Sequence, residues 1–282
     1  MRLEWYFSEK VQQALKVLRQ ALTFNRPIVL LFSGGKDSLV CLDLCYHYLR
    51  PKNFSVVYVE VTGNTHPLSR DHALKTLQSY GVNYYYLKSP NFWNLFHRYG
   101  YPFLPMVLKE HRRGIRWCLK ECKQRVWESF IKDKVVVSGI KASDRPIRKQ
   151  IVSEGLIREV HYYRYTEFIN VMPIGLWSDD DVWEYIEREG LKKYLDPCYK
   201  LTGDSGNCVF CFFMGKSKFK KLLTAAHHDS FCKQVVSKFI EIHFRLKIRE
   251  KQGLDVGVKK IYEHWDKLLS KLLNQQLLTN FM

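Results

Sequence analysis

The chain alternates between short apolar runs and longer amphipathic stretches. Runs of strand length that are rich in valine, isoleucine and tyrosine predict buried strands. They cover residues 27–33, 55–61, 84–87, 135–138 and 169–172. Stretches with apolar residues three or four positions apart predict helices. They cover residues 8–22, 36–49 and 66–80, and Gly81 is a suitable C-cap for the last of them.

Strands that alternate with helices at these lengths predict an α/β fold. The sheet is expected to be mostly parallel and twisted, with helices on both faces because parallel crossovers are right-handed. From about residue 190 the pattern changes to a cysteine-bearing loop and two long helices, over 231–252 and 258–278. We therefore expect a nucleotide-binding α/β domain over 1–190 and a C-terminal helical region over 191–282. Segment 90–118 is rich in aromatic residues, proline and arginine and is expected to be a long irregular insertion.

The stretch LFSGGKDSLV, residues 31–40, joins the first predicted strand to a predicted helix. Ligands of parallel sheets bind at such strand ends. Gly34 and Gly35 allow close backbone approach, and successive N–H groups at a helix N-terminus form a concave anion site. Ser33 and Ser38 add hydroxyl donors, Lys36 adds a positive charge, and Asp37 could cap the helix or hold Mg²⁺. The alternative is an ordinary glycine turn.

A second group of polar residues follows the fourth predicted strand. Lys141, Arg145, Arg148 and Lys149 would lie at the same edge of the sheet as the loop over 33–38. Arginine side chains bind phosphate or sulfate oxygens in a bidentate manner. The alternative is a solvated basic loop. For Trp177–Ile186 a structural role is expected instead, with Ser178 as an N-cap, three aspartates in the first turn, and Val182, Trp183 and Ile186 facing the core.

The cysteines form two close pairs. Cys208 and Cys211 make a CxxC in a glycine-rich loop, and Cys118 and Cys122 are four residues apart on one helical face. Together they predict a four-thiolate metal site, and both Zn²⁺ and an iron–sulfur cluster accept four cysteines. Cys41 and Cys45 lie in an apolar helix and are expected to be buried thiols.

The net charge narrows the choice of partners. The 282 residues include 45 Lys and Arg against 28 Asp and Glu, a formal charge of +17. A surplus of this size favours a polyanionic partner, RNA or another nucleic acid first and anionic nucleotides second. No apolar run reaches the about 20 residues of a membrane helix, and the N-terminus MRLEWYFSEK does not look like a signal peptide. We expect a cytoplasmic protein without membrane contact; a homodimer is one of the assemblies left open.

Several motifs resemble one known family. SGGKDS resembles the pyrophosphate loop of N-type ATP pyrophosphatases, the PP-loop superfamily, and FSGGKDSLVCLDL looks most like its PAPS reductase branch. Further motifs follow in the family's order along residues 27 to about 215. They are VTGNTHP (61–67), which resembles "DTG…P"; RWC (116–118) followed by Lys123, which resembles "RWC…K"; GIKASDR (139–145) with Arg148, which resembles "G-[IV]-R-A-x-[DE]-S…R"; and PIGLWSDDDVWEYI (173–186), which resembles "P[IL]…W…DVW.YI".

The resemblance implies an adenine nucleotide alpha hydrolase-like fold that binds ATP with Mg²⁺. It implies nucleotide contacts by the loop, by Thr62 near the adenine and ribose, and by the segment after the fourth strand. The expected binding residues are Ser33, Gly34, Gly35, Lys36, Asp37, Ser38, Thr62, Gly139, Lys141, Arg145 and Arg148, of which Lys36, Asp37 and Arg145 are expected to be catalytic. Many members hold a 4Fe–4S cluster at positions that match Cys118, Cys208 and Cys211. Cys122, Cys198 and Cys232 are rival candidates for the fourth ligand, and zinc is the alternative metal.

Three functions fit these features. The first is an adenylating enzyme that releases pyrophosphate from ATP and supports cluster-dependent sulfur transfer to a nucleic acid, as in tRNA thiolation. The second is a sulfonucleotide reductase that releases sulfite. Its family members use a C-terminal cysteine tail, whereas this chain ends LLNQQLLTNFM. The third is a nucleic-acid-binding module that uses ATP as a switch. Aromatic side chains in 84–117 suit base stacking, with core packing as the alternative.

Overall fold

The computed structural model describes residues 9–102, 116–162 and 166–274. The chain divides into two compact units. Unit 1 comprises 1–59, 68–87 and 127–197, and unit 2 comprises 60–67, 88–126 and 198–282. Unit 2 thus contains two segments that precede residue 190, besides the C-terminal helices. Among the described helices, none is long and apolar enough to cross a membrane.

Six strands form one sheet in the order β3-β2-β1-β4-β6-β5. Its central strands pair in parallel, and β5 runs antiparallel to β6 at one edge. The α/β fold class with a mostly parallel sheet is therefore confirmed, but the sequence pattern missed β5. The strands are β1 Ile28–Phe32, β2 Phe54–Glu60, β3 Asn83–Lys88, β4 Val135–Val137, β5 Ile157–Tyr162 and β6 Thr166–Val171.

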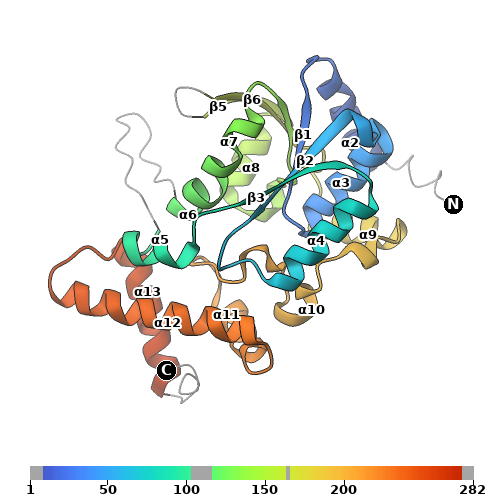
Figure 1. Ribbon diagram of the computed structural model, residues 1–282. Helices are drawn as coiled ribbons and strands as arrows, with labels where there is room; N and C mark the ends of the chain where they lie inside the picture. The colour runs from blue at the N-terminus through green and yellow to red at the C-terminus, as the bar shows by residue number, and fades with distance from the viewer. Residues whose placement is uncertain (1–8, 103–115, 163–165, 275–282) are drawn as a thin grey trace. The chain divides into compact units, whose positions relative to one another are not determined.

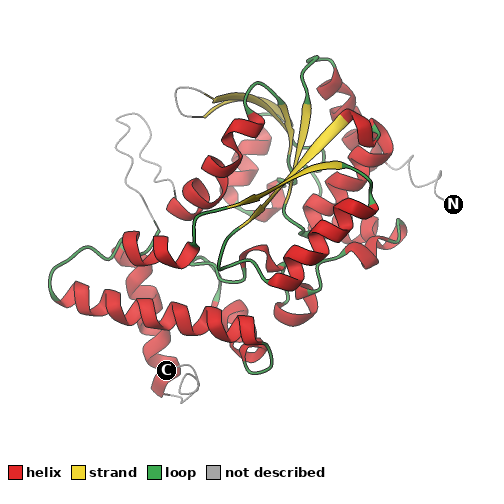
Figure 2. Ribbon diagram, in the orientation of Figure 1, coloured by secondary structure: helices red, strands yellow, loops and turns green. Residues whose placement is uncertain are grey.

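Helices cover both faces of the sheet (Figures 1 and 2). One face carries α2 Glu9–Leu22, α3 Lys36–Leu49, α4 Pro67–Ser79 and α9 Asp179–Arg188, and the other carries α7 Arg125–Ile131 and α8 Pro146–Ser153. The apolar faces of the first group pack on β1, β2, β4 and β6 in a continuous core. The predicted N-cap of α9 is confirmed, since Ser178 and Asp181 form a capping box. Trp183 is 40% exposed, so its predicted place in the core is wrong; Tyr185 is buried instead.

Strand order reverses beside β1. The chain runs from β1 to β2 and β3 on one side, and then returns to place β4 on the other side. A ligand crevice in an open parallel sheet lies outside the carboxyl ends of the two strands where the order reverses. Here those ends are followed by the loop 33–35 after β1 and by Ser138–Lys141 after β4. The fold thus brings together the two polar segments that the sequence singled out.

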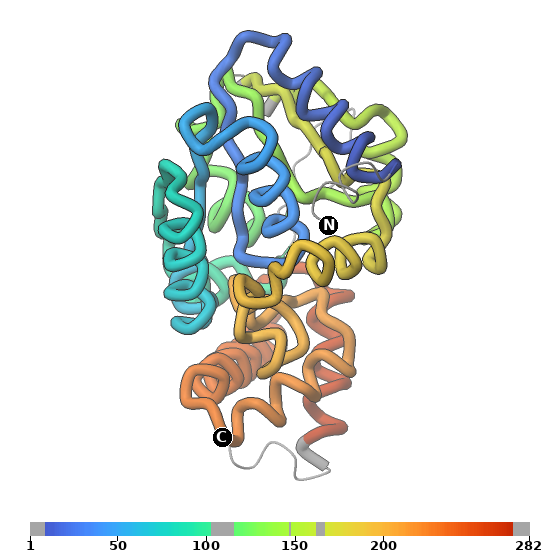
Figure 3. Tube along the Cα trace, turned by 90° about the vertical axis from the view of Figure 1, so that its right-hand side faces the viewer, coloured from blue at the N-terminus to red at the C-terminus, as the bar shows by residue number. Residues whose placement is uncertain are grey.

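Unit 2 is helical around an aromatic core. Its C-terminal helices are the orange and red part of the trace in Figure 3. Phe210, Phe239 and Trp265 make mutual ring contacts in it, with centroids 4.3–5.4 Å apart. On the last helix Trp265, Leu268, Leu269 and Leu272 are buried in this core. The described helices are α5 Phe92–Tyr99, α6 Trp117–Leu119, a π-helical turn Lys120–Gln124, α10 Cys198–Thr202, α11 Lys216–Ala226, α12 Ser230–Lys251 and α13 Lys259–Asn274.

The expected irregular insertion is partly wrong, because α5 is a regular helix capped by Asn91. Its amphipathic pattern is short, and the neighbouring proline and glycine obscured it. Phe92, Phe96 and Trp117 are buried in the aromatic core. Their packing favours the core interpretation of these aromatic residues over base stacking. Residues 103–115 of this segment lie outside the described residues.

Candidate functional site

The loop after β1 folds through hydrogen bonds among its own residues. Ser38 Oγ accepts the backbone N–H of Ser33 at 3.2 Å and donates to the carbonyl of Gly35 at 2.9 Å. Gly34 has φ +77°, a conformation that residues with a Cβ rarely adopt. This glycine therefore allows the tight turn between strand and helix.

The turn leaves the start of α3 facing the edge of the sheet. Gly35 is the N-cap, and among the described residues no side chain caps this helix. The first N–H groups of a helix have no intrahelical partner and attract anions. Residues 33–38 thus combine backbone donors, two hydroxyls and Lys36 at one strand end, as an oxyanion site requires.

Lys141 forms the centre of an ion network beside this loop. Its side chain is fully buried, and its Nζ lies 2.6 Å from Asp37 Oδ1. Carboxylate oxygens of Asp144 and Asp179 each lie 2.9 Å away. Burial disfavours the charged form, but hydrogen bonds to these carboxylates prevail and raise the pKa of Lys141. The ammonium therefore ties three segments of unit 1 together: the loop, the chain after β4 and the start of α9.

Lys36 belongs to the same network from the rim. Its Nζ lies 2.8 Å from Asp179 Oδ1 and 3.2 Å from Asp37 Oδ1. Hydrogen bonds from Lys36 and Lys141 lower the pKa of Asp179 to about 2. The sequence interpretation gave Asp179 only a role at a helix start. Its contact with two lysines depends on the approach of α9 to α3, and the local pattern carries no signal of this.

The structure brings most of the predicted nucleotide-binding residues together in unit 1. Gly139 lies against the loop: a Cβ there would be 3.0 Å from the carbonyl carbon of Asp37. Arg148 pairs with Asp144, whereas Arg145 is exposed. Thr62 falls in unit 2, where its N–H donates to Ser89 Oγ at 3.1 Å. Its predicted role near the adenine and ribose stays a prediction.

The four predicted metal-binding cysteines come together within unit 2. Burial, followed by the neighbouring Cys208, Cys211 and Cys122, raises the pKa of Cys118 to about 12. Burial and then Cys208 raise the pKa of Cys122 to about 12 as well. Thiolates that disfavour one another in this way would be stabilised by a shared cation. Cys122 lies in the π-helical turn, a local widening of a helix that is common at functional sites.

Two basic side chains act on this cysteine set, alongside the acidic Glu121 and Asp204. Arg116 lowers the pKa of Cys118 against the effect of burial, and Lys123 does the same for Cys122 and Cys208. Asn64 donates from Nδ2 to Cys208 Sγ at 3.5 Å. Positive charge and donors next to sulfur favour the thiolate form that binds metals. Cys41 and Cys45, by contrast, are fully buried in α3, as expected.

The spacing of the four thiols bears on the kind of metal. A tetrahedral zinc with Zn–S bonds of about 2.3 Å holds its sulfurs about 3.8 Å apart. Among the described cysteines, no three of these thiols lie within 4.8 Å of one another. A cluster with separate irons holds its thiolates farther apart than a single ion does. Both metals accept four thiolates, and the choice between a cluster and one zinc stays a prediction.

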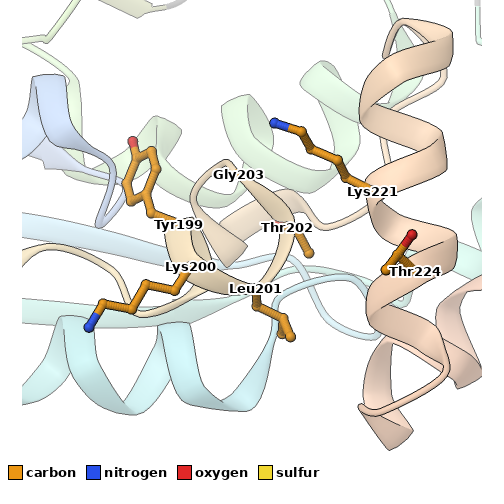
Figure 4. Close-up of a pocket in the computed structure, with 7 residues that line it drawn as sticks. All are labelled: Tyr199, Lys200, Leu201, Thr202, Gly203, Lys221 and Thr224. Atoms are coloured by element: carbon orange, nitrogen blue, oxygen red, sulfur yellow. The ribbon is translucent and has the colours of Figure 1, made fainter.

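Unit 2 also has an open basic pocket of about 290 Å³, shown in Figure 4. The turn of α10 forms one side of it, and Lys221 and Thr224 on α11 form the other. Lys200 and Lys221 are among its lining residues, and the Lys200 ammonium points away from α11 in Figure 4. The predicted nucleotide-binding and metal-binding residues do not line this pocket, so it is separate from both sites described above.

Comparisons with known proteins found relatives in sequence and in fold. The chain is 29% identical over 210 residues to an uncharacterized protein from Methanocaldococcus jannaschii; the match covers 70% of this chain and 38% of the relative, so the chain spans well under half of that protein's length. Among solved structures, phosphoadenylyl-sulfate reductase from Candida auris, in a phosphate complex, has 17% identity and a TM-score of 0.44, with 63% of this chain and 80% of that chain covered.

The U34-tRNA thiolase NcsA from Methanococcus maripaludis, solved with its 4Fe–4S cluster, has 16% identity and a TM-score of 0.43, with 83% of this chain and 78% of that chain covered. The family model of the phosphoadenosine phosphosulfate reductase domain matches residues 27–196, which include the loop, the strand ends and the Lys141 network. The chain therefore belongs to the phosphoadenosine phosphosulfate reductase domain family.

Proposed function

We propose that this protein binds ATP with Mg²⁺, adenylates an acceptor with release of pyrophosphate, and supports sulfur transfer to a nucleic acid. The observation that supports ATP binding is the turn of Ser33–Ser38 at the start of α3. No described side chain caps this helix start, and Lys36 and Lys141 flank it. Family membership supports a nucleotide at this place.

The proposed reaction starts with attack of an acceptor oxygen on the α-phosphorus of ATP. The bond from this phosphorus to the bridging oxygen breaks, and pyrophosphate leaves with its negative charge. Backbone N–H groups of the loop and the Lys36 ammonium stabilise that charge as it develops. Asp37 would hold Mg²⁺ between the phosphates. A sulfur nucleophile then attacks the adenylated carbon and displaces AMP.

The ion network indicates different roles for Lys36 and Lys141. Lys36 has 14% of its side chain exposed and pairs with the largely exposed Asp179. Replacement of this carboxylate by a phosphate oxygen as the partner of Lys36 therefore costs little free energy. Lys141 is wholly buried among three carboxylates and keeps Asp37 in position. We assign phosphate binding to Lys36 and a positioning role to Lys141.

The sulfur step is assigned to Cys118, Cys122, Cys208 and Cys211. They would hold a 4Fe–4S cluster, which when bound can supply sulfide for the transfer. Lys123 and Arg116 would balance part of the negative charge of the thiolates.

The nucleic-acid partner is supported by charge. On α11 the exposed Lys216, Lys218, Lys220 and Lys221 stand opposite the buried Phe219, Leu222 and Leu223. Lys221 also lies at the rim of the basic pocket in Figure 4. Exposed lysines along one helix suit phosphate contacts that position a nucleic acid without reading its sequence.

Turnover tests this proposal. The protein, purified without oxygen, is incubated with ATP and Mg²⁺ with and without unmodified RNA, and pyrophosphate and orthophosphate are measured separately. We expect pyrophosphate, with AMP, only when RNA is present. Release of sulfite from a sulfonucleotide would show reduction instead, and tight ATP binding without turnover would show a switch. The described late cysteine, Cys232, is fully buried, which disfavours it as the reductase nucleophile.

Gly139→Ala is expected to weaken ATP binding about tenfold, because a shift of the loop by a few tenths of an ångström misplaces its donors. The new Cβ would lie 3.0 Å from the carbonyl carbon of Asp37 and 3.1 Å from Ser38 N. Calorimetric titration with ATP and Mg²⁺ measures the change. Gly215→Ala is the matched control, since a Cβ there meets nothing within 4 Å. Equal ATP affinities of the two variants would show that Gly139 does not contribute to the nucleotide site.

A further inference from the structure

A second group of metal-binding side chains lies in unit 2, apart from the four cysteines. His66, Asp229 and Cys232 have ligand atoms that all lie within 4.8 Å of one another. His66 Nε2 is 3.2 Å from Asp229 Oδ1. The imidazole is 3% exposed, the thiol is fully buried, and the carboxylate is 21% exposed. We propose that these three residues bind one Zn²⁺ ion, with water in the fourth position.

The donor set matches zinc in chemistry and in charge. Thiolate, imidazole and carboxylate are all common zinc ligands. One thiolate and one carboxylate cancel the two positive charges of the ion, so the buried site is neutral. When the Cys232 sulfur binds zinc as a thiolate, the thiol proton is released to solvent, and His66 binds as the neutral imidazole. With Zn–N and Zn–O bonds of about 2.0–2.2 Å, a tetrahedral site spaces these two atoms by about 3.4 Å, close to the 3.2 Å observed.

A helix cap explains only part of this arrangement. Asp229 is the N-cap of α12, and its Oδ1 accepts the backbone N–H of Cys232 at 2.7 Å. That cap uses neither the thiol nor the imidazole. His66 is held here independently, by a backbone hydrogen bond to Gly206 O of 2.8 Å and by ring contact with Phe231. The imidazole is thus positioned before any metal arrives.

A second histidine–aspartate pair in the described part of unit 2, His243 and Asp266, differs from this site in its cation. His243 Nε2 lies 3.2 Å from Asp266 Oδ1, and Lys247 Nζ lies 2.7 Å from the same oxygen. A lysine therefore supplies the cation at that pair. In the described part of the chain, His66 is the only basic side chain that pairs with Asp229. At the His66–Asp229 pair, Cys232 takes the place that Lys247 has at the His243–Asp266 pair. A thiol in place of a lysine favours a metal cation there.

Metal analysis of the protein tests this proposal. Zinc and iron are measured by mass spectrometry after passage over a chelating resin, before and after equilibration with zinc sulfate. We expect one zinc per chain in the wild type, and a fall of about tenfold or more in Cys232→Ser and Asp229→Asn. Both variants keep the N-cap, so both should fold. Asp266→Asn removes the carboxylate of the other pair and should keep its zinc, while iron stays unchanged in all three.

X-ray absorption at the zinc edge gives a second readout without any substitution. We expect one sulfur and three nitrogen or oxygen neighbours. Four sulfur neighbours, or zinc that persists in Cys232→Ser, would place the ion at the other cysteines and overturn the proposal. A wild type that stays free of zinc after equilibration would overturn it as well. Neither outcome depends on ATP turnover, so this site and the proposed function can fail separately.

Discussion

Lys141→Met is expected to lower the free energy of unfolding by about 3 kcal/mol and to abolish measurable ATP binding. Methionine fills the volume of the lysine stem but leaves the carboxylates of Asp37, Asp144 and Asp179 close together without their shared cation. Breaking a buried ion pair on one side costs about 3–5 kcal/mol. The lower end applies because Asp179 is largely exposed and solvent screens it. Urea unfolding and calorimetric titration with ATP measure the two effects.

The matched control for this substitution is Lys149→Met. Lys149 is an exposed lysine eight positions further along the same segment, and its loss should change the free energy of unfolding by less than about 0.5 kcal/mol. If Lys141→Met were as stable as this control and still bound ATP, the network would have no part in holding the loop.

Cys208→Ser is expected to remove the iron–sulfur cluster and with it the transfer of sulfur. After burial, Cys208 is the largest cause that raises the pKa of both Cys118 and Cys122, and its sulfur accepts a hydrogen bond from Asn64. Serine is a poor iron ligand at this place because its hydroxyl stays protonated. Iron and sulfide content, measured after anaerobic purification, should fall to about a tenth or less, together with the visible absorption.

Two further variants separate the candidates for the fourth ligand. Cys122→Ser is expected to lose iron as Cys208→Ser does. Cys198→Ser is expected to keep it, although Cys198 is also fully buried. A colourless wild-type protein with zinc at Cys118, Cys208 and Cys211 would contradict the cluster, and sulfur transfer would then lose its support. ATP-dependent release of pyrophosphate could still be tested in that case.

The sequence contained enough to locate the phosphate loop. Ser33–Ser38 is contiguous, and its glycines, hydroxyls and lysine act through backbone geometry between one strand and the next helix. Such local geometry follows from residue type and from the position after an apolar run. The parallel strands could be read for a similar reason, since strands buried on both faces are continuous apolar runs.

The errors have a common cause. The exposed Trp183, the regular helix α5 and the strand β5 were misassigned because packing partners distant in sequence decide whether such short patterns are buried or regular. Asp179 was taken for a helix-start residue, and that role is real, but the sequence does not reveal its two lysine partners.

Composition, motif order and strand pattern sufficed for the fold class, the family resemblance and the place of the oxyanion loop, because each rests on residues close together in the chain. The three-carboxylate environment of Lys141 and the meeting of His66 with Asp229 and Cys232 could be seen only after folding. Both join segments more than a hundred residues apart, and only long-range packing within each unit brings such side chains into contact.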